Sequence, residues 1–247
     1  MASTTAPVRA VDARRRRRIQ LGAVAAAAVV VVAAMIAVSL AGVRDAAPPG
    51  PGERPAGAAD VGARFAGIRQ HGAALGDPRA PVTLVEFADL QCPFCAEWDR
   101  QVLPAVLQRV RRGEVRLVLR PLRFLGPDSA TAAALAGAAA QQNRMWPLVD
   151  LLYRNQGREN SGYLTPAFQR RIAAAVPGLD VTRLMAARDT PAAMRLTETA
   201  EREARTAEVA STPSFLAGRR GGTLSPVVTN SVAARDFLAA VDKAAGR

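Results

Sequence analysis

The sequence predicts an α/β domain, and three observations lead to this fold class. Two short apolar strand patterns, in residues 82–87 and 115–119, flank a helical pattern. A block of helical patterns then runs from residue 128 to about residue 207. Strand patterns return in residues 212–228, before a last helix. Because two strands that are joined through a helix run parallel in one sheet, we interpret the block as a helical insertion into a sheet domain.

The first 43 residues predict a membrane anchor. Residues 1–18 form a basic tail that ends in the run Arg14–Arg18, and residues 19–43 contain no charged side chain. About 20 apolar residues span a bilayer core, and basic flanks stay in the cytoplasm. We therefore expect a single-pass signal anchor at 19–43, with a cytoplasmic N-terminus and the rest of the chain outside the cell membrane. A cleaved signal peptide is the alternative, but its apolar core is normally only about 7–15 residues long.

Residues 44–62 predict a spacer, because four prolines and three glycines lie between residues 48 and 57. Such a composition favours a semi-extended chain without a core. The folded domain is then expected over residues 63–247, with the helical insertion at about 122–208. An extracytoplasmic domain faces an oxidising compartment, in which disulfides form and persist.

Local sequence patterns predict the strands and the helix of the first half of the domain. Residues 68–70 predict a short strand, and Val82–Phe87 is β-branched and apolar, which predicts a buried strand. The next helix is expected over about 93–110, starting at a proline in its first turn and kinked at Pro104. Residues 115–119 predict a second strand, parallel to the first.

The elements after the helical block close the domain. Residues 212–216 and 223–228, joined by a glycine-rich turn, predict an antiparallel hairpin. Pro226 makes the second of these strands an edge strand, because proline has no N–H to donate to a neighbour. Ser231 is expected to cap a final helix over 232–244.

The composition argues against a nucleic-acid-binding protein. The 247 residues carry a net charge of +12, and the chain is rich in arginine, alanine and glycine, as proteins from GC-rich genomes are. Outside the basic tail, the arginines are scattered among acids, as in Glu201-Arg202-Glu203. A nucleic-acid interface gathers basic residues on one surface or interleaves them with aromatic residues. We therefore expect no nucleic-acid partner.

The only two cysteines of the chain predict disulfide exchange. They stand two residues apart in Cys92-Pro93-Phe94-Cys95, within five residues of the end of the predicted strand. A thiolate is the nucleophile of this chemistry, and the N–H groups at a helix N-terminus stabilise a negative charge at the first cysteine. Cys92 is then the attacking thiol, and Cys95, one turn into the helix, is the resolving thiol.

Two other uses of a cysteine pair fit the sequence less well. A structural disulfide across two residues closes so small a loop that it adds little stability. A zinc site needs four ligands, whereas the chain has no third cysteine and only one histidine, His71. We therefore expect no metal, and no cofactor besides the redox-active Cys92–Cys95 disulfide.

Several stretches together resemble the DsbA-like thiol–disulfide oxidoreductases, a thioredoxin-fold family, in a form with an N-terminal membrane anchor. They are Gly76-Asp77-Pro78, residues 80–87, Gln91–Cys95, residues 160–165 and Thr212–Phe215. The resemblance covers roughly residues 68–245 and implies a thioredoxin fold with an inserted helical subdomain. It also implies an enzyme that exchanges disulfides with thiols of exported proteins, and a membrane redox partner that re-oxidises or re-reduces the motif.

The resemblance also implies roles for individual residues. Glu86 matches the acidic residue that relays protons to the second cysteine, with a half-exposed strand carboxylate as the alternative. Thr212-Pro213 matches the cis-proline loop that faces the two cysteines. This loop leaves the backbone of Thr212 free to pair with a substrate strand. The implied substrate-binding residues are Thr212, Pro93 and Phe94, and the implied catalytic residues are Cys92, Cys95, Glu86 and Pro213.

Two features bear on the direction of the reaction. Thr212 precedes Pro213, as a threonine also does in isomerase and reductase relatives. Phe94 stands where the strongest oxidases of the family carry a histidine, which helps to stabilise the thiolate. We expect an oxidase, with a reductase or isomerase of the same fold as the alternative. A third reading is a non-catalytic module that binds unfolded chains in an apolar groove lined by Phe94, Trp98 and Phe215. The sequence leaves the direction, the clients, the redox partner and the oligomeric state open.

Overall fold

The computed structural model describes residues 53–229, 231 and 233–246. The predicted basic tail, the predicted signal anchor and the first part of the predicted spacer lie outside these residues. Within the described part of the chain, no helix is both long enough and apolar enough to cross a membrane.

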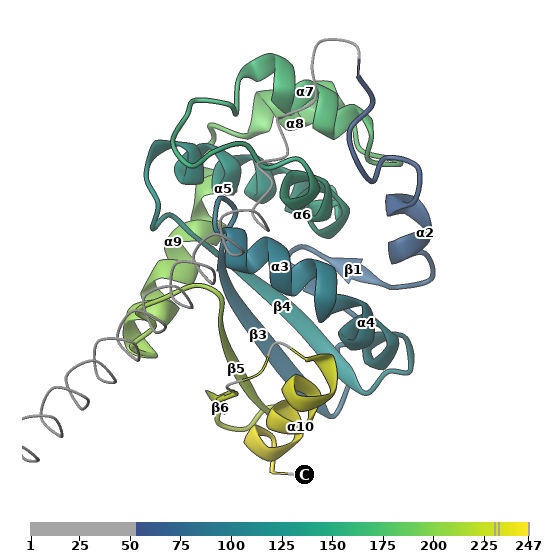
Figure 1. Ribbon diagram of the computed structural model, residues 1–247, viewed down its shortest axis with the longest axis vertical. Helices are drawn as coiled ribbons and strands as arrows, with labels where there is room; N and C mark the ends of the chain where they lie inside the picture. Colours follow the sequence, from purple (N-terminus) through teal and green to yellow (C-terminus); the bar gives the residue numbers. More distant parts are fainter. Residues whose placement is uncertain (1–52, 230, 232, 247) are drawn as a thin grey trace, which may run out of the picture. The chain divides into compact units, whose positions relative to one another are not determined.

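A mixed sheet with the strand order β1-β2-β4-β3-β5-β6 organises the described residues (Figure 1). Its strands are β1 Gln70–His71, β2 Ala74–Leu75, β3 Val82–Asp89, β4 Val115–Leu122, β5 Ser214–Arg219 and β6 Ser225–Pro226. The two central strands β3 and β4 are parallel, and every other neighbouring pair is antiparallel. The predicted strand–helix–strand unit is therefore present, and β5 lies on the other side of β3.

The helices separate into two groups around this sheet. They are α2 Val61–Phe65, α3 Pro93–Gln101, α4 Leu103–Arg111, α5 Pro127–Ala140, α6 Met145–Arg154, α7 Pro166–Ala174, α8 Val181–Ala187, α9 Pro191–Thr206 and α10 Ala234–Ala244. Helices α5 to α9 follow one another between β4 and β5, as the predicted insertion, and α5 to α8 gather at one end of the sheet (Figure 1).

The two faces of β3 are buried against different helices. Leu84 belongs to the main core, to which α3, α4 and α10 also contribute. Val85 and Phe87 belong to a second apolar cluster with Ala200 and Ala204 of α9. Because successive side chains of a strand point to opposite faces, the residues of β3 next to Val85 in the sequence point to the face that α3 covers. Glu86 is one of them.

Local signals predicted most element positions correctly. The predicted helix over 93–110 is broken at Val102 into α3 and α4, next to the proline at which a kink was expected. The second strand of the C-terminal hairpin is limited to Ser225–Pro226, shorter than predicted. The short first strand lies at Gln70–His71 and pairs with Ala74–Leu75, rather than at 68–70.

Two predicted boundaries differ from the structure. The spacer ends before residue 62, because Pro55 and Val61 are buried and Ala56 exchanges two hydrogen bonds with the side chain of Asn155. Ser231 does not cap the last helix, since α10 begins at Ala234 after Ala233. The Ser231 hydroxyl instead accepts a hydrogen bond from the N–H of Ala233, in the turn before the helix.

Candidate active site

Cys92 stands at the junction between the central strand and the active-site helix. Strand β3 ends at Asp89, whose carbonyl accepts a hydrogen bond from the N–H of Cys92 at 3.0 Å. Cys92 is the N-cap residue of α3, and Pro93 occupies the first turn, where its missing N–H costs no hydrogen bond. The Cys92 sulfur therefore lies beside the free N–H groups of the helix N-terminus.

The surroundings of Cys92 lower the pKa of its thiol to about 6, from the ordinary value of 9.0. The largest cause is a hydrogen bond from the Cys95 thiol, followed by contributions from the Thr212 side chain and from the N–H groups of Cys95 and Phe94, while burial acts in the opposite direction. The helix N-terminus was the cause expected from the sequence. The larger contribution of Cys95 was missed, although the spacing of the two cysteines could have indicated it.

The surroundings of Cys95 shift the pKa of its thiol in the opposite direction. Its side chain is fully buried, and burial raises the pKa of its thiol well above the ordinary value. The neighbouring Cys92 and the negative charge of Glu86 raise it further. At neutral pH the site therefore holds a reactive Cys92 thiolate next to a protonated Cys95, and both cysteines are free thiols in this structure.

Glu86 is a buried carboxyl on β3, only 1% exposed. Burial raises its pKa well above the ordinary value, and the nearby Asp99 raises it further. The alternative of a half-exposed strand carboxylate is therefore wrong. Because Glu86 also contributes to the raised pKa of Cys95, the two groups lie close enough for the proton of one to depend on the charge of the other.

The loop before β5 brings Thr212 and Pro213 next to Cys92. The Thr212–Pro213 peptide bond is cis, as the resemblance implied. The Cys92 sulfur lies 3.4 Å from the carbonyl oxygen of Thr212, to which the protonated thiol donates a hydrogen bond. This contact forms because β5 pairs with β3, with Ser214 opposite Phe87.

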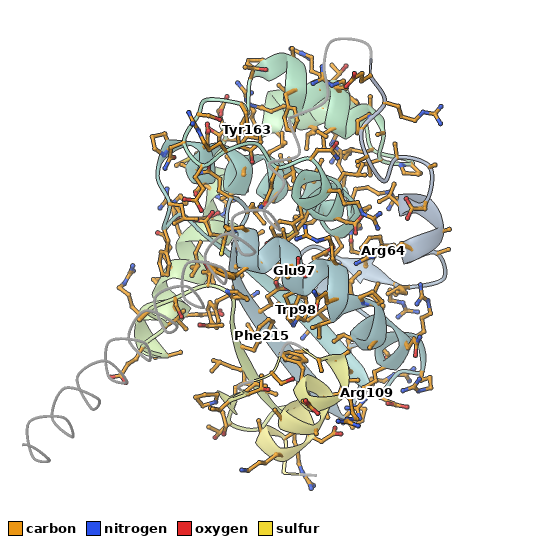
Figure 2. All side chains as sticks on the ribbon, in the orientation of Figure 1. Arg64, Glu97, Trp98, Arg109, Tyr163 and Phe215 are labelled. Carbon is orange, nitrogen blue, oxygen red and sulfur yellow. The ribbon has the colours of Figure 1, made fainter. Side chains whose placement is uncertain are left out.

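An apolar groove of about 530 Å³ opens beside the motif. Trp98 and Phe215 stack with ring centroids 4.8 Å apart, and Figure 2 shows the two side chains next to each other between α3 and β5. Pro213 also lines the groove, as does Phe94, which is 72% exposed. The predicted groove is therefore present, and its exposed aromatic ring lies within the motif itself.

A polar network behind the motif was missed by the sequence reasoning. The buried carboxylate of Asp89 accepts hydrogen bonds from the N–H of Gln91, the hydroxyl of Ser129 and the N–H groups of residues 124 and 125. Gln91 also exchanges hydrogen bonds with Asn160 of the insertion. In the sequence, Gln91 and Asn160 stand out only through the stretches that resemble the DsbA-like family. Together these contacts attach the loop before Cys92 to the helical insertion.

A buried charge cluster connects α2, α3 and α6. Arg64 of α2 forms ion pairs with Asp99 of α3 at 3.1 Å and with Asp150 of α6 at 2.9 Å. Arg154 pairs with Asp150 at 2.9 Å. Burial raises the pKa of Asp99, and the carboxylate of Asp150 raises it further, whereas Arg64 opposes both. No local sequence signal indicated this cluster, because it joins three helices.

Comparisons with known proteins show the family and the fold of this chain. The family model described as "Thioredoxin" matches residues 69–242. A probable disulfide bond formation protein D of Bacillus cereus is 36% identical over 94 residues, which are 37% of this chain and 44% of that protein. The chain spans about half the length of the curated relatives with that name.

Two solved structures have the same fold. The oxidised BdbD of Bacillus subtilis superimposes with a TM-score of 0.59 at 19% identity, covering 81% of this chain and 98% of that one. DsbA2 of Pseudomonas aeruginosa does so with a TM-score of 0.54 at 25% identity, covering 73% of this chain and 97% of that one. The expected thioredoxin fold with a helical insertion is thus confirmed, and the chain belongs to the thioredoxin family, with the architecture of its DsbA-like members.

Proposed function

We propose that this protein is a thiol–disulfide oxidoreductase that donates disulfides to exported proteins, held at the outer side of the cell membrane by residues 19–43. The observation that carries the proposal is the pair of opposed thiols at the start of α3. Cys92 has a pKa lowered to about 6, whereas burial raises the pKa of Cys95. The relatives named disulfide bond formation protein D support the same chemistry.

The arrangement allows a two-step exchange. A client thiolate attacks the Cys92 sulfur of the oxidised motif, and Cys95 leaves with the electron pair and takes up a proton. A second client thiolate then attacks the client sulfur of this mixed disulfide, and Cys92 leaves as a thiolate. Two electrons pass from the client to the motif, and the client gains a disulfide. A membrane redox partner would then remove the two electrons.

The stabilised Cys92 thiolate favours the oxidase direction. A low thiol pKa makes Cys92 a good leaving group and stabilises the reduced form of the motif, which makes the disulfide more oxidising. The groove and the Thr212 backbone would hold the client as an extended segment beside the sulfur. These surroundings replace the histidine that the inner dipeptide lacks.

Equilibration of the full chain with glutathione buffers tests the direction. A reduction potential near about −120 mV supports an oxidase, and one near about −270 mV indicates a reductase. Refolding of a scrambled multi-disulfide protein distinguishes an isomerase. In cells, a Cys95→Ala variant should accumulate mixed disulfides between Cys92 and exported clients, and their absence would contradict the proposal.

The exposed ring of Phe94 favours one alternative, a module that binds unfolded chains without catalysis. A Cys92→Ser variant separates the two functions. If client binding and the cellular role persist unchanged in this variant, the groove and not the thiol carries the function. Protease accessibility of the domain in spheroplasts tests the location, and the mass of the mature chain distinguishes an anchor from a cleaved signal peptide.

A further inference from the structure

Tyr153, near the end of α6, holds a buried hydroxyl that forms no hydrogen bond among the described residues. The side chain is 4% exposed and belongs to the same apolar core as Cys95. A buried donor without a partner costs free energy, and a phenylalanine would fill the same space without that cost. The hydroxyl therefore needs an explanation beyond packing.

Glu86 presents the complementary feature. Its Oε1 atom is also buried without a hydrogen-bond partner among the described residues. A neutral carboxyl tolerates this better than a carboxylate, which binds hydrogen-bond donors strongly. Glu86 thus has a buried acceptor atom, and Tyr153 a buried donor, without a hydrogen-bond partner among the described residues.

The two groups share one electrostatic environment around the second cysteine. Burial raises the pKa of Tyr153 well above the ordinary value, and the charges that raise it further belong to Cys95, Glu86, Asp99 and Cys92, in decreasing order. The Tyr153 hydroxyl therefore keeps its proton throughout the working pH range. It is therefore a neutral group in the environment of Cys95 and Glu86, and its O–H can donate a hydrogen bond to a carboxylate.

We propose that Tyr153 is a positioning residue for the exchange, whose hydroxyl donates a hydrogen bond to the Glu86 carboxylate while Glu86 serves as the base for Cys95. This inference rests on the proposed function. In the first step of the proposed oxidation, protonated Glu86 gives its proton to the departing Cys95 thiolate. In the reverse of that step, which resolves a mixed disulfide and releases an unoxidised client, the proton of the Cys95 thiol passes to the Glu86 carboxylate, and the Cys95 sulfur attacks the sulfur of Cys92. The bond from Cys92 to the client sulfur breaks, and the client leaves as a thiolate.

The other charged groups around this position do not offer such a donor to Glu86. Asp99 of α3 is an acid and raises the pKa of Glu86. Arg64 of α2 pairs with Asp99 and Asp150, and Arg154 of α6 pairs with Asp150 and Asp60. Both guanidinium groups are thus held by other carboxylates. The Tyr153 hydroxyl is a buried neutral donor without a partner among the described residues, as the indole N–H of Trp98 also is, and it is the one whose pKa is raised by the charges of both Cys95 and Glu86.

The test follows the resolving step directly. The full chain is loaded at Cys92 with a coloured aryl thiol, and the release of the aryl thiolate by Cys95 is recorded across a pH series. The Tyr153→Phe variant loses only the hydroxyl, so the Glu86 carboxylate becomes less stable and its pKa rises. We expect the pH profile of release to move to higher pH by about one unit, with release at neutral pH slowed roughly tenfold.

A matched control is available in the insertion. Tyr163 is also buried, and burial, Asp128 and Asp89 raise its pKa, without a contribution from either cysteine. It lies in the helical part of the molecule, away from Trp98 (Figure 2). Tyr163→Phe should leave the pH profile unchanged, even if its melting temperature falls.

A double-variant cycle with Glu86→Gln completes the test. If the hydroxyl acts through Glu86, Tyr153→Phe should slow release no further in the Glu86→Gln background. The inference about Tyr153 would be overturned if Tyr153→Phe kept the wild-type pH profile. It would also be overturned if Tyr153→Phe slowed release equally with Glu86 present and in the Glu86→Gln background. Neither result would contradict the proposed function. If Cys95→Ala releases the aryl thiolate as fast as the wild type, the proposed function itself fails.

Discussion

The Cys95 thiol donates a hydrogen bond to the Cys92 sulfur, and this contact is the largest cause of the lowered pKa of Cys92. The same contact raises the pKa of Cys95, because a proton held between two sulfurs favours the charged form of one and the neutral form of the other. The motif itself thus supplies the largest cause of the lowered pKa of Cys92, whereas burial is the largest cause of the raised pKa of Cys95.

Removal of the Cys95 thiol should raise the pKa of Cys92. In Cys95→Ala, the pKa of Cys92 should rise above the wild-type value of about 6, toward the ordinary thiol value. The ultraviolet absorbance of the thiolate as a function of pH measures this shift. Cys95→Ser keeps a donor at the same position and should show a smaller rise. An unchanged pKa in Cys95→Ala would mean that the helix N-terminus dominates instead.

The lowered pKa of Cys92 also makes the stability of the reduced protein depend on pH. A thiol whose pKa is depressed in the folded state contributes stability that is fully present above its unfolded pKa and is lost as the pH falls through the folded value. The contribution of Cys92 should therefore disappear between about pH 9 and about pH 6. Urea unfolding of the reduced wild type and of Cys92→Ser should converge toward low pH. A constant difference between them would contradict this prediction.

Glu86 should cost stability while serving the reaction. Because burial raises its pKa, ionisation of Glu86 is easier in the unfolded chain, so its unfavourable contribution grows as the pH rises above the ordinary carboxyl value. We expect Glu86→Gln to increase the free energy of unfolding at pH 8 by about 1–3 kcal/mol, and to slow resolution by Cys95. Thermal melting and single-turnover kinetics measure the two effects. Loss of stability in Glu86→Gln would show that the carboxylate is paired.

Substitution of Phe94 should affect client binding, whereas substitution of Trp98 should affect the free energy of unfolding. Phe94 is 72% exposed, so Phe94→Ala should change the free energy of unfolding by less than about 0.5 kcal/mol while weakening client binding. Trp98 is 7% exposed and packs on Phe215 and Phe237, so Trp98→Ala should cost about 3–5 kcal/mol. Chemical denaturation and KM for a thiol peptide measure these effects. Unchanged KM in Phe94→Ala would remove this ring from the client site.

The contribution of Arg64 to the free energy of unfolding should be larger at high pH than at low pH. It is the cation that pairs with both Asp99 and Asp150, so Arg64→Met leaves two buried carboxyls beside each other. We expect a loss of about 3–5 kcal/mol at pH 8, which shrinks as Asp99 takes up a proton at lower pH. Arg111→Met is a suitable control, because Arg111 also contacts α2, through the carbonyl of Arg64, but is exposed. Equal losses in both variants would point to the docking of α2 alone.

Sequence patterns predicted a helix or strand well where the residues that determine the element lie within it or next to it in the chain. The β-branched run in Val82–Phe87 and the proline after Cys92 placed β3 and the start of α3 correctly. Ser231 shows the limit of such signals. Its hydroxyl does accept a hydrogen bond from a backbone N–H two residues later, but that N–H belongs to the turn and not to the helix. The spacer prediction failed at its end for a related reason, since composition does not reveal that Val61 is buried.

The sequence was sufficient to predict the fold and to place the cysteine pair at the start of a helix after a buried strand, because this arrangement is local in the chain. The placement of Thr212 against Cys92, 120 residues apart, depends on the pairing of β5 with β3. The cluster of Arg64, Asp99 and Asp150 likewise depends on how α2, α3 and α6 pack. Burial and charge at a site are sums over such distant neighbours, and they set the pKa values of Cys92, Cys95 and Glu86 on which the proposed chemistry depends.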